Sequence, residues 1–260
     1  MIGIFDSGLG GLTALKELRE LCPKCDIVYF GDTGRVPYGT RSREILLRYS
    51  DEDIKLLLSK GAGRILAACG TVSSVALPVI ENDYPVKVTG VVKPAALEAV
   101  NATKNKRIGV IGTGATISSK AFSREIASLD PEIEVIEVAC PLFVPLVENG
   151  FIREDCAITA LTVEEYLTPI KKFGADTLIL GCTHFPIIAK HIGAFLGESV
   201  TLINSGSAAA KELARENSAT TGSGKCDIYV SDSPATFESV AKIFLDTDTV
   251  PDVHTVRIGE

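Results

Sequence analysis

The sequence predicts an α/β protein of two pseudo-symmetric domains, each a mostly parallel sheet flanked by helices, with its functional site in the cleft between them. Short apolar runs alternate with amphipathic stretches along almost the whole chain, and this alternation is typical of β-α-β units. Two segments recur later in the same order, which indicates two similar halves. The 260 residues, 46% of them hydrophobic, suffice for two domains with sizeable cores.

The predicted strands are short runs rich in Val, Ile, Leu and Phe, separated by stretches with helical spacing. They are expected at 2–5, 26–30, 64–68, 88–92, 107–111, 133–138, 176–180, 200–203 and 228–230. A row of leucines predicts the first helix, and a second apolar face predicts a longer helix after Arg43. The residues of these two faces are Leu12, Leu15, Leu18, Ile54, Leu57 and Leu58. Late helices are expected at 208–216 and 235–245, with a loop at 220–225.

An internal repeat supports the two halves. Residues 2–8 resemble residues 108–114, and residues 61–69 match residues 174–182. The matched segments are separated by 106 and 113 residues, so the second half starts near residue 106. Because both matches occur in the same order, chance is a poor explanation. From the repeat alone, the segment after about Ser205 can belong to either half.

Charge and composition exclude several classes of protein. The net charge of −7 argues against a surface for nucleic acid or an anionic membrane and favours a small-molecule ligand. The start of the chain lacks the basic residues of a signal peptide and has an acid at Asp6, so a cytoplasmic location is expected. The longest uncharged stretch, 65–80, is short and partly polar, so it is expected in a core and not in a membrane. The seven cysteines are odd in number and widely spaced, so reduced thiols are expected.

Four loops are candidate binding segments, because ligands of open α/β sheets bind at the carboxyl ends of strands. Each half contributes one turn with a hydroxyl and a glycine, and one cysteine, Cys69 or Cys182. The cleft between the halves is therefore expected to present one thiol on each wall. The four loops are residues 6–8, 69–71, 112–116 and 182–184.

Two opposed thiols suit the inversion of a stereocentre by proton transfer, which needs a base on one face and an acid on the other. A thiolate takes the proton from the carbon atom, and the opposite thiol returns one to the planar carbanion. Asp6 and His184 are expected beside the two thiols, where each can tune a thiol or relay protons. A single free cysteine is often simply buried in a core. The matched placement of Cys69 and Cys182 favours the chemical role.

Four motifs resemble those of glutamate racemases, and the resemblance runs over nearly the whole chain. They are Phe5-Asp-Ser-Gly-Leu-Gly-Gly-Leu-Thr13, Gly31-Asp-Thr-Gly-Arg-Val-Pro-Tyr-Gly39, Ala68-Cys-Gly-Thr71 and Leu180-Gly-Cys-Thr-His184. The resemblance implies a cytoplasmic isomerase that interconverts L- and D-glutamate without pyridoxal phosphate, metal or another cofactor. It implies a supply of D-glutamate for peptidoglycan synthesis, and hence for cell wall biogenesis and cell shape. It also implies that the C-terminal segment returns to the first half, which gives one domain of 1–95 plus 206–260 and a second of 96–205.

The resemblance also implies roles for individual residues. Cys69 is expected to act on the D enantiomer and Cys182 on the L enantiomer, with assistance from Asp6 and His184. The turn at 37–39 is expected to hold the side-chain carboxylate of the substrate, and Glu148 to lie near its amino group. Hydroxyls, main-chain N–H groups and helix N-termini can bind two carboxylates without an arginine. The positions expected to bind substrate are Ser7, Pro37, Tyr38, Gly39, Gly70, Thr71, Thr113, Thr116, Glu148 and Thr183.

One position departs from the family pattern. Glutamate racemases usually have an asparagine after the first cysteine, where this chain has Gly70. A side-chain contact to the substrate is therefore missing, and the substrate preference is open at this position. The oligomeric state is open as well, with a homodimer as one option.

Other interpretations depend on weaker patterns. Gly8-Leu-Gly10 with Asp32 partly imitates a dinucleotide fingerprint, but Thr13 occupies the third glycine position. Lys93 is the lysine that best suits a pyridoxal phosphate aldimine, although an exposed lysine at a helix start is the simpler expectation.

Two further motifs are expected to be structural. Cys22-Pro-Lys-Cys25 resembles half of a zinc or redox site, but no second cysteine pair accompanies it, so both cysteines are expected to pack a turn. His191 is expected on the same helix as His184 and exposed to solvent.

Three alternative functions compete with this interpretation, and one of them stays open. A racemase of the same superfamily for aspartate or another amino acid is kept open by Gly70. A single-cysteine hydrolase or decarboxylase is disfavoured, because it has no need of a second matched thiol. A non-catalytic amino-acid-binding protein is disfavoured because both thiols are present.

Overall fold

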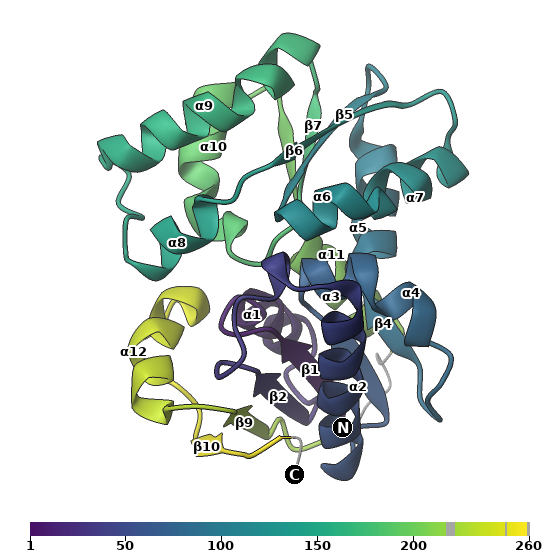
Figure 1. The fold of residues 1–260 in the computed structure, drawn as a ribbon, viewed down its shortest axis with the longest axis vertical. Coiled ribbons are helices and arrows are strands. Elements are labelled where there is room, and N and C mark those ends of the chain that lie inside the picture. The colour runs from purple at the N-terminus through teal and green to yellow at the C-terminus, as the bar shows by residue number, and fades with distance from the viewer. Residues whose placement is uncertain (217–221, 248, 259–260) are drawn as a thin grey trace.

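The computed structural model describes residues 1–216, 222–247 and 249–258. Its strands form two sheets in which every pairing between neighbours is parallel. The first sheet has the order β10-β9-β2-β1-β3-β4, and the second has the order β6-β5-β7-β8. Figure 1 shows the two sheets in separate lobes with helices around them. The predicted fold class is therefore confirmed.

The strand bounds follow the apolar runs closely, because strands of a parallel sheet are covered on both faces and need continuous apolar sequence. All five residues of both β1 and β2 are buried. The first sheet contains β1 (Ile2–Asp6), β2 (Ile27–Gly31), β3 (Arg64–Ala67), β4 (Val88–Gly90), β9 (Cys226–Val230) and β10 (Val253–Thr255). The second contains β5 (Arg107–Gly112), β6 (Glu134–Ala139), β7 (Thr177–Leu180) and β8 (Thr201–Asn204).

The internal repeat is visible in the topology and in the register. The order β2-β1-β3-β4 recurs as β6-β5-β7-β8. In the first sheet Phe5 pairs with Ala67, and in the second Ile111 pairs with Leu180. These pairs are related by the 106- and 113-residue separations seen in the sequence. The two sheets are therefore repeats of one unit, to which the first adds β9 and β10.

Helices connect the strands and cover both sheets. The apolar face of α1 (Leu12–Leu21) is fully buried as predicted. In α2 (Arg43–Ser59), Ile54 and Leu57 are buried and Leu58 is half-buried. The other helices are α3 (Gly70–Val75), α4 (Leu77–Ile80), α5 (Val92–Ala102), α6 (Gly114–Ser119), α7 (Ala121–Leu129), α8 (Phe143–Glu148), α9 (Ala157–Phe173), α10 (Ala189–Leu196), α11 (Ser205–Glu216) and α12 (Pro234–Leu245), with 3-10 turns η1 (Tyr38–Thr40) and η2 (Phe185–Ile188).

Helix α11 links the halves. Figure 1 places α11 between the two lobes, where it packs against α1 of the first half and α5 of the second. The chain then returns to the first sheet through β9, which pairs with β2. The predicted loop at 220–225 lies outside the described residues at 220–221, and 222–225 is neither helix nor strand.

Several predicted details were wrong. β4 ends at Gly90, and the residues up to 92 turn into α5 instead of extending the strand. β10 was not predicted, because it is a short edge strand with exposed residues and no apolar run. His184 and His191 do not share one helix, because η2 separates His184 from α10. His191 is also buried and not solvated.

The cysteines of the Cys22-Pro-Lys-Cys25 turn form a disulfide, which corrects the expectation of reduced thiols there. The end of α1 brings the two Cα atoms to 5.4 Å, a separation that a disulfide can span. The other five cysteines are free. In the described part of the chain, no helix combines the length and the apolar character needed to span a membrane.

Candidate functional site

A pocket of about 330 Å³ is lined by the segments that follow β1, β2 and β3 of the first sheet and β5, β6 and β7 of the second. The carboxyl ends of both sets of strands therefore meet at one site, as expected for open α/β sheets. Within the described residues that line it, neither lysine nor arginine occurs. The predicted site residues in its wall are Ser7, Pro37, Tyr38, Gly39, Cys69, Gly70, Thr71, Thr113, Glu148, Cys182, Thr183 and His184.

Cys69 lies in the part of the wall that the first sheet provides. It follows β3 and occupies the position before the first residue of α3. Its side chain is buried, and its Sγ donates a hydrogen bond to Ser7 Oγ at 3.6 Å. Burial raises the pKa of the Cys69 thiol to about 12, and the nearby Asp6 acts in the same direction. Cys69 is therefore a protonated thiol at neutral pH.

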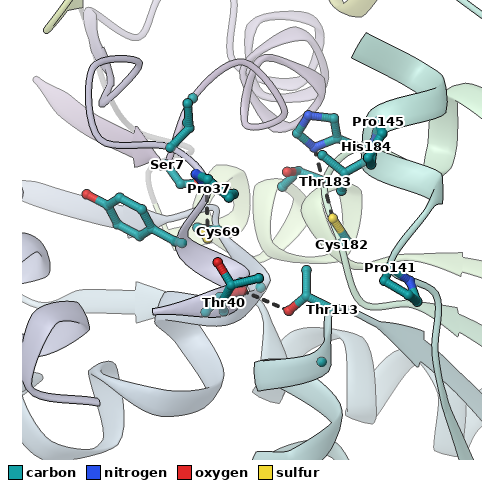
Figure 2. Close-up of a pocket in the computed structure, with 18 of the residues that line it drawn as sticks. Ser7, Pro37, Thr40, Cys69, Thr113, Pro141, Pro145, Cys182, Thr183 and His184 are labelled. Carbon is teal, nitrogen blue, oxygen red and sulfur yellow. Dashed lines mark hydrogen bonds between the residues drawn. The ribbon is translucent and has the colours of Figure 1, made fainter. Parts of the chain in front are cut away.

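Cys182 occupies the matching position after β7 of the second sheet. Its Sγ lies 4.0 Å from His184 Nδ1, and His184 Nε2 lies 3.0 Å from Glu148 Oε1. Burial opposes protonation of His184, but the hydrogen bonds to Cys182 and Glu148 outweigh it and raise the His184 pKa to about 10. Figure 2 shows Cys182 beside His184 and Cys69 beside Ser7. Each thiol therefore has a hydrogen-bonding neighbour of its own.

Asp6 lies behind the wall and does not line the pocket. It is fully buried at the end of β1, where its carboxylate accepts hydrogen bonds from the Gly8 main-chain N–H at 2.9 Å and from Thr183 Oγ1 at 3.3 Å. Burial raises the Asp6 pKa, and the charge of His184 partly opposes this. Asp6 thus joins the turn after β1 to the loop that carries the second thiol.

Three predicted threonines form a chain of hydroxyls between the halves. Thr71 Oγ1 lies 3.0 Å from Thr113 Oγ1, which lies 3.0 Å from Thr116 Oγ1. Thr113 also caps α6, because its Oγ1 accepts a hydrogen bond from the Thr116 main-chain N–H at 3.3 Å. Thr116 is buried behind Thr113 and does not line the pocket. Thr71 and Thr113 are the hydroxyls of this chain that can reach a ligand.

The turn Pro37–Gly39 lines the pocket, but the phenol of Tyr38 is buried. The Tyr38 hydroxyl donates hydrogen bonds to Asp32 and, at 3.1 Å, to Asp53 Oδ2. Burial and these two carboxylates raise the Tyr38 pKa, so the phenol stays neutral. The Tyr38 hydroxyl is therefore turned to these carboxylates and is not available to the pocket.

A buried ionic network holds this turn in place. Arg35 binds Asp32 Oδ2 through Nε at 2.6 Å, Asp53 Oδ1 through Nη2 at 2.9 Å, and Glu52 through Nη1. Ser231, which follows β9, donates to Asp32 Oδ1 at 2.7 Å. Both aspartate side chains are fully buried. The sequence does not predict this network, although Asp32 and Arg35 both stand in the Gly31–Gly39 motif.

Sequence reasoning also missed Cys140, a third thiol in the pocket wall. It follows β6, and burial raises its pKa. The rule that selected the other strand ends applies equally to the predicted strand 133–138 and selects this residue. Gly8 and Gly114 also line the pocket and lie in the candidate loops 6–8 and 112–116. The lining residues outside the predicted loops and positions are Val36, Thr40, Pro141, Val144 and Pro145, besides Cys140.

Of the residues in the weaker motifs, Gly8 lines the pocket, but Lys93 and Asp32 do not. Lys93 is exposed near the start of α5, which confirms the expectation of an exposed lysine at a helix start. Its Nζ lies 3.3 Å from Glu81 Oε1. Asp32, the acid of the partial dinucleotide fingerprint, is buried in the Arg35 network. Across the described residues, no three His, Cys, Asp or Glu side chains gather in a way that suits a metal ion.

Comparison with known proteins agrees with this geometry. The model of the Asp/Glu/hydantoin racemase family matches residues 18–213. The glutamate racemase of Geobacter metallireducens is 43% identical over 99% of this chain and 96% of its own. The structure of a glutamate racemase isoform from Bacillus anthracis superimposes with a TM-score of 0.93 at 34% identity, covering 98% of this chain and 97% of that one. The glutamate racemase of Francisella tularensis, solved in complex with D-glutamate, gives a TM-score of 0.89 at 36% identity, covering 98% and 96%. The chain belongs to the Asp/Glu/hydantoin racemase family.

Proposed function

We propose that this chain is a glutamate racemase that interconverts L- and D-glutamate by two-thiol proton transfer at Cα. The observation that carries the proposal is the presence of Cys69 and Cys182 in one pocket, each two residues beyond matching strands of two repeated sheets. Relatives named glutamate racemase, of which the Geobacter protein is 43% identical over 99% of this chain, support glutamate as the substrate.

The reaction moves two protons and needs no other group transfer. The thiolate on one face takes the proton from Cα, and the resulting carbanion is planar. The thiol on the other face then donates its proton to Cα, which leaves the inverted amino acid and a thiolate on that face. His184, protonated and 4.0 Å from the Cys182 sulfur, relays protons for Cys182. Cys69, held protonated by burial, is the acid when L-glutamate reacts. The reverse direction exchanges the roles of the two thiols.

The pocket offers groups for both carboxylates and for the amino group. Main-chain N–H groups of the turn Pro37–Gly39 bind the side-chain carboxylate, because the Tyr38 hydroxyl is already occupied. The hydroxyls of Thr71, Thr113, Thr183 and Ser7 bind the α-carboxylate and orient Cα between the thiols. Glu148 is the acidic residue of the wall and lies near the amino group.

We also propose the wider features that the family resemblance implies. The enzyme needs no cofactor or metal, because two thiols supply both the base and the acid. It works in the cytoplasm and supplies D-glutamate for peptidoglycan synthesis. Its two domains are 1–95 plus 206–260 and 96–205, a division supported by the separate sheets on which they are built.

Proton exchange tests the proposal directly. In D2O, the protein should incorporate deuterium at Cα of L-glutamate while the optical rotation of the solution decays to zero, because each inversion delivers a proton that has equilibrated with solvent. NMR of the Cα proton and polarimetry measure the two processes. Parallel incubations with L-aspartate and other amino acids are the control for substrate choice.

Each alternative predicts a different result. Faster exchange with aspartate than with glutamate would assign the chain to another substrate, at the position where Gly70 replaces the usual asparagine. Saturable binding of glutamate without deuterium exchange at Cα would mean that the chain is a binding protein and not a racemase. Either result would overturn the proposed function.

A further inference from the structure

A second pocket, the seam pocket, lies where helices of the two halves meet. Its volume is about 430 Å³. One side is formed by residues of α2, α3 and α4, which connect strands of the first sheet, and the other by residues of α6 and α7, which follow β5 of the second. Figure 1 shows α6 and α7 next to α3 and α4 where the two lobes meet. A ligand in the seam pocket would therefore contact both halves.

Every charged residue that lines the seam pocket, among the described residues, is an arginine. They are Arg41, Arg43 and Arg124, in a chain whose net charge is −7. Arg35 and Arg64 each form a salt bridge, but within the described part of the chain none of the three arginines of the seam pocket does. Each guanidinium carries five N–H donors. The seam pocket therefore gathers positive charge that no carboxylate of this protein neutralises through a salt bridge.

A buried hydroxyl adds a neutral donor to the wall. Ser74, in α3, lines the seam pocket and is only 3% exposed. Its Oγ is buried and has no hydrogen-bond partner among the described residues. Buried hydroxyls are normally hydrogen-bonded, so an exception needs an explanation. An acceptor oxygen of a ligand in the seam pocket would supply the missing partner.

We propose that the seam pocket binds the phosphate groups of a small phosphorylated molecule, held by Arg41 and Arg43 on one side and Arg124 on the other, with Ser74 as an inner donor. Guanidinium groups bind phosphate oxygens through paired N–H bonds. A phosphate monoester carries about 1.5–2 negative charges at neutral pH, so two linked phosphates match three guanidiniums better than carboxylates do. The volume of about 430 Å³ suits a small molecule and exceeds the needs of a single phosphate.

The seam pocket shares its walls with the pocket of the two thiols. Arg41 follows Thr40, the last residue of η1, and Thr40 lines the pocket of the thiols. Ala115 lines the seam pocket, and its neighbour Gly114 lines the pocket of the thiols. The elements η1 and α6, which carry these residues, contact each other. The proposed ligand therefore bridges the halves beside the candidate substrate site.

Isothermal titration calorimetry with inorganic pyrophosphate at low salt tests the proposal. We expect saturable binding that is weakened about 10-fold or more in both Arg43→Gln and Arg124→Gln, because each removes a charge-assisted hydrogen bond from a different side of the pocket. Ser74→Ala should weaken binding a few-fold. Arg48→Gln is the matched control, since Arg48 is an exposed arginine of the same α2 that does not line the seam pocket. It should keep the wild-type affinity.

Several results would overturn the proposal. Wild-type protein that shows no saturable binding of pyrophosphate would do so. Equal weakening in Arg43→Gln and Arg48→Gln would mean that only the overall charge matters. Weakening in Arg43→Gln without weakening in Arg124→Gln would place the anion on one half alone. The calorimetric readout does not need racemisation, so failure of the proposed function would leave this test intact.

A separate arm distinguishes a soluble phosphorylated molecule from a lipid headgroup. Cosedimentation with phosphatidylglycerol vesicles should be absent, because the net charge of −7 opposes binding to an anionic surface. Vesicle binding that is lost in Arg43→Gln and Arg124→Gln would assign these arginines to a membrane surface and overturn the proposed ligand. Far-UV circular dichroism of each variant should match the wild type, since both arginine side chains are exposed.

Discussion

Replacing either thiol should end racemisation while leaving exchange on one face of the substrate. Cys69→Ser and Cys182→Ser should each lower the rate of inversion by about 10²–10⁴-fold, the contribution of one positioned acid or base. A serine hydroxyl of the same shape does not ionise near neutral pH. With Cys69→Ser, the remaining thiol should still wash deuterium into L-glutamate without inverting it. With Cys182→Ser, the same should hold for D-glutamate.

Cys226→Ser is the matched control, because it removes a free, half-buried cysteine that does not line the pocket. It should racemise like the wild type. Mass spectrometry of glutamate recovered from D2O, after chiral separation, measures retention and inversion in one assay. A residual inversion rate equal to that of wild type in either pocket variant would exclude the two-thiol scheme. Exchange of both enantiomers by a single-thiol variant would exclude the division between the two faces.

The placement of the two thiols could be predicted from sequence because the repeat specifies it. Residues 2–8 and 108–114 become equivalent central strands, and the segments that end in Cys69 and Cys182 become equivalent neighbours of those strands. Periodicity determines which residues are strands, and the carboxyl ends of parallel strands share one edge. These local rules therefore predict which residues line the pocket, although they do not predict how the two halves pack.

Features that depend on packing between elements could not be predicted. The close approach of Gly70 to the carbonyl oxygen of Gly181 exists only once the residues after β7 lie against the start of α3, and the sequence alone does not show it. The gathering of Asp32 and Asp53 around Arg35 and the Tyr38 hydroxyl requires the end of β2 to meet the middle of α2. β10 pairs at an edge with exposed residues, so no apolar run predicts it.

Removing the cation of the buried network should destabilise the fold strongly. Arg35→Met should lower the free energy of unfolding by about 3–5 kcal/mol, because it leaves buried carboxylates of Asp32 and Asp53 without their partner. Urea unfolding followed by circular dichroism measures the change. Arg153→Met is the matched control: Arg153 pairs with Asp155 at 3.0 Å, but both side chains are largely exposed. It should change stability by about 0–1 kcal/mol.

The loss in Arg35→Met should depend on pH in a direction that identifies its cause. Burial raises the Asp53 pKa well above its usual value, the charge of Asp32 adds to this, and Arg35 opposes it. Without Arg35 the folded-state pKa rises further above the unfolded value of about 3.9. A carboxyl with a raised folded-state pKa contributes stability below its unfolded pKa and loses it as pH rises through the folded one. The deficit should therefore be larger at pH 8 than at pH 5.

The double variant Arg35→Met/Asp53→Asn should recover part of the lost stability, because it removes a buried charge that Arg35 no longer balances. The stability loss in Arg35→Met could instead be independent of pH and unrelieved by Asp53→Asn. That result would assign the effect to lost packing of Arg35 against Tyr49, because the guanidinium carbon of Arg35 lies 4.1 Å from the centroid of the Tyr49 ring. Under the ionic explanation, the Tyr38 hydroxyl loses ordered partners as well. Arg35→Met should then raise KM for glutamate as well as lower stability. The carboxylates of Asp32 and Asp53 that Arg35 binds also hold the turn 37–39, which we propose faces the substrate.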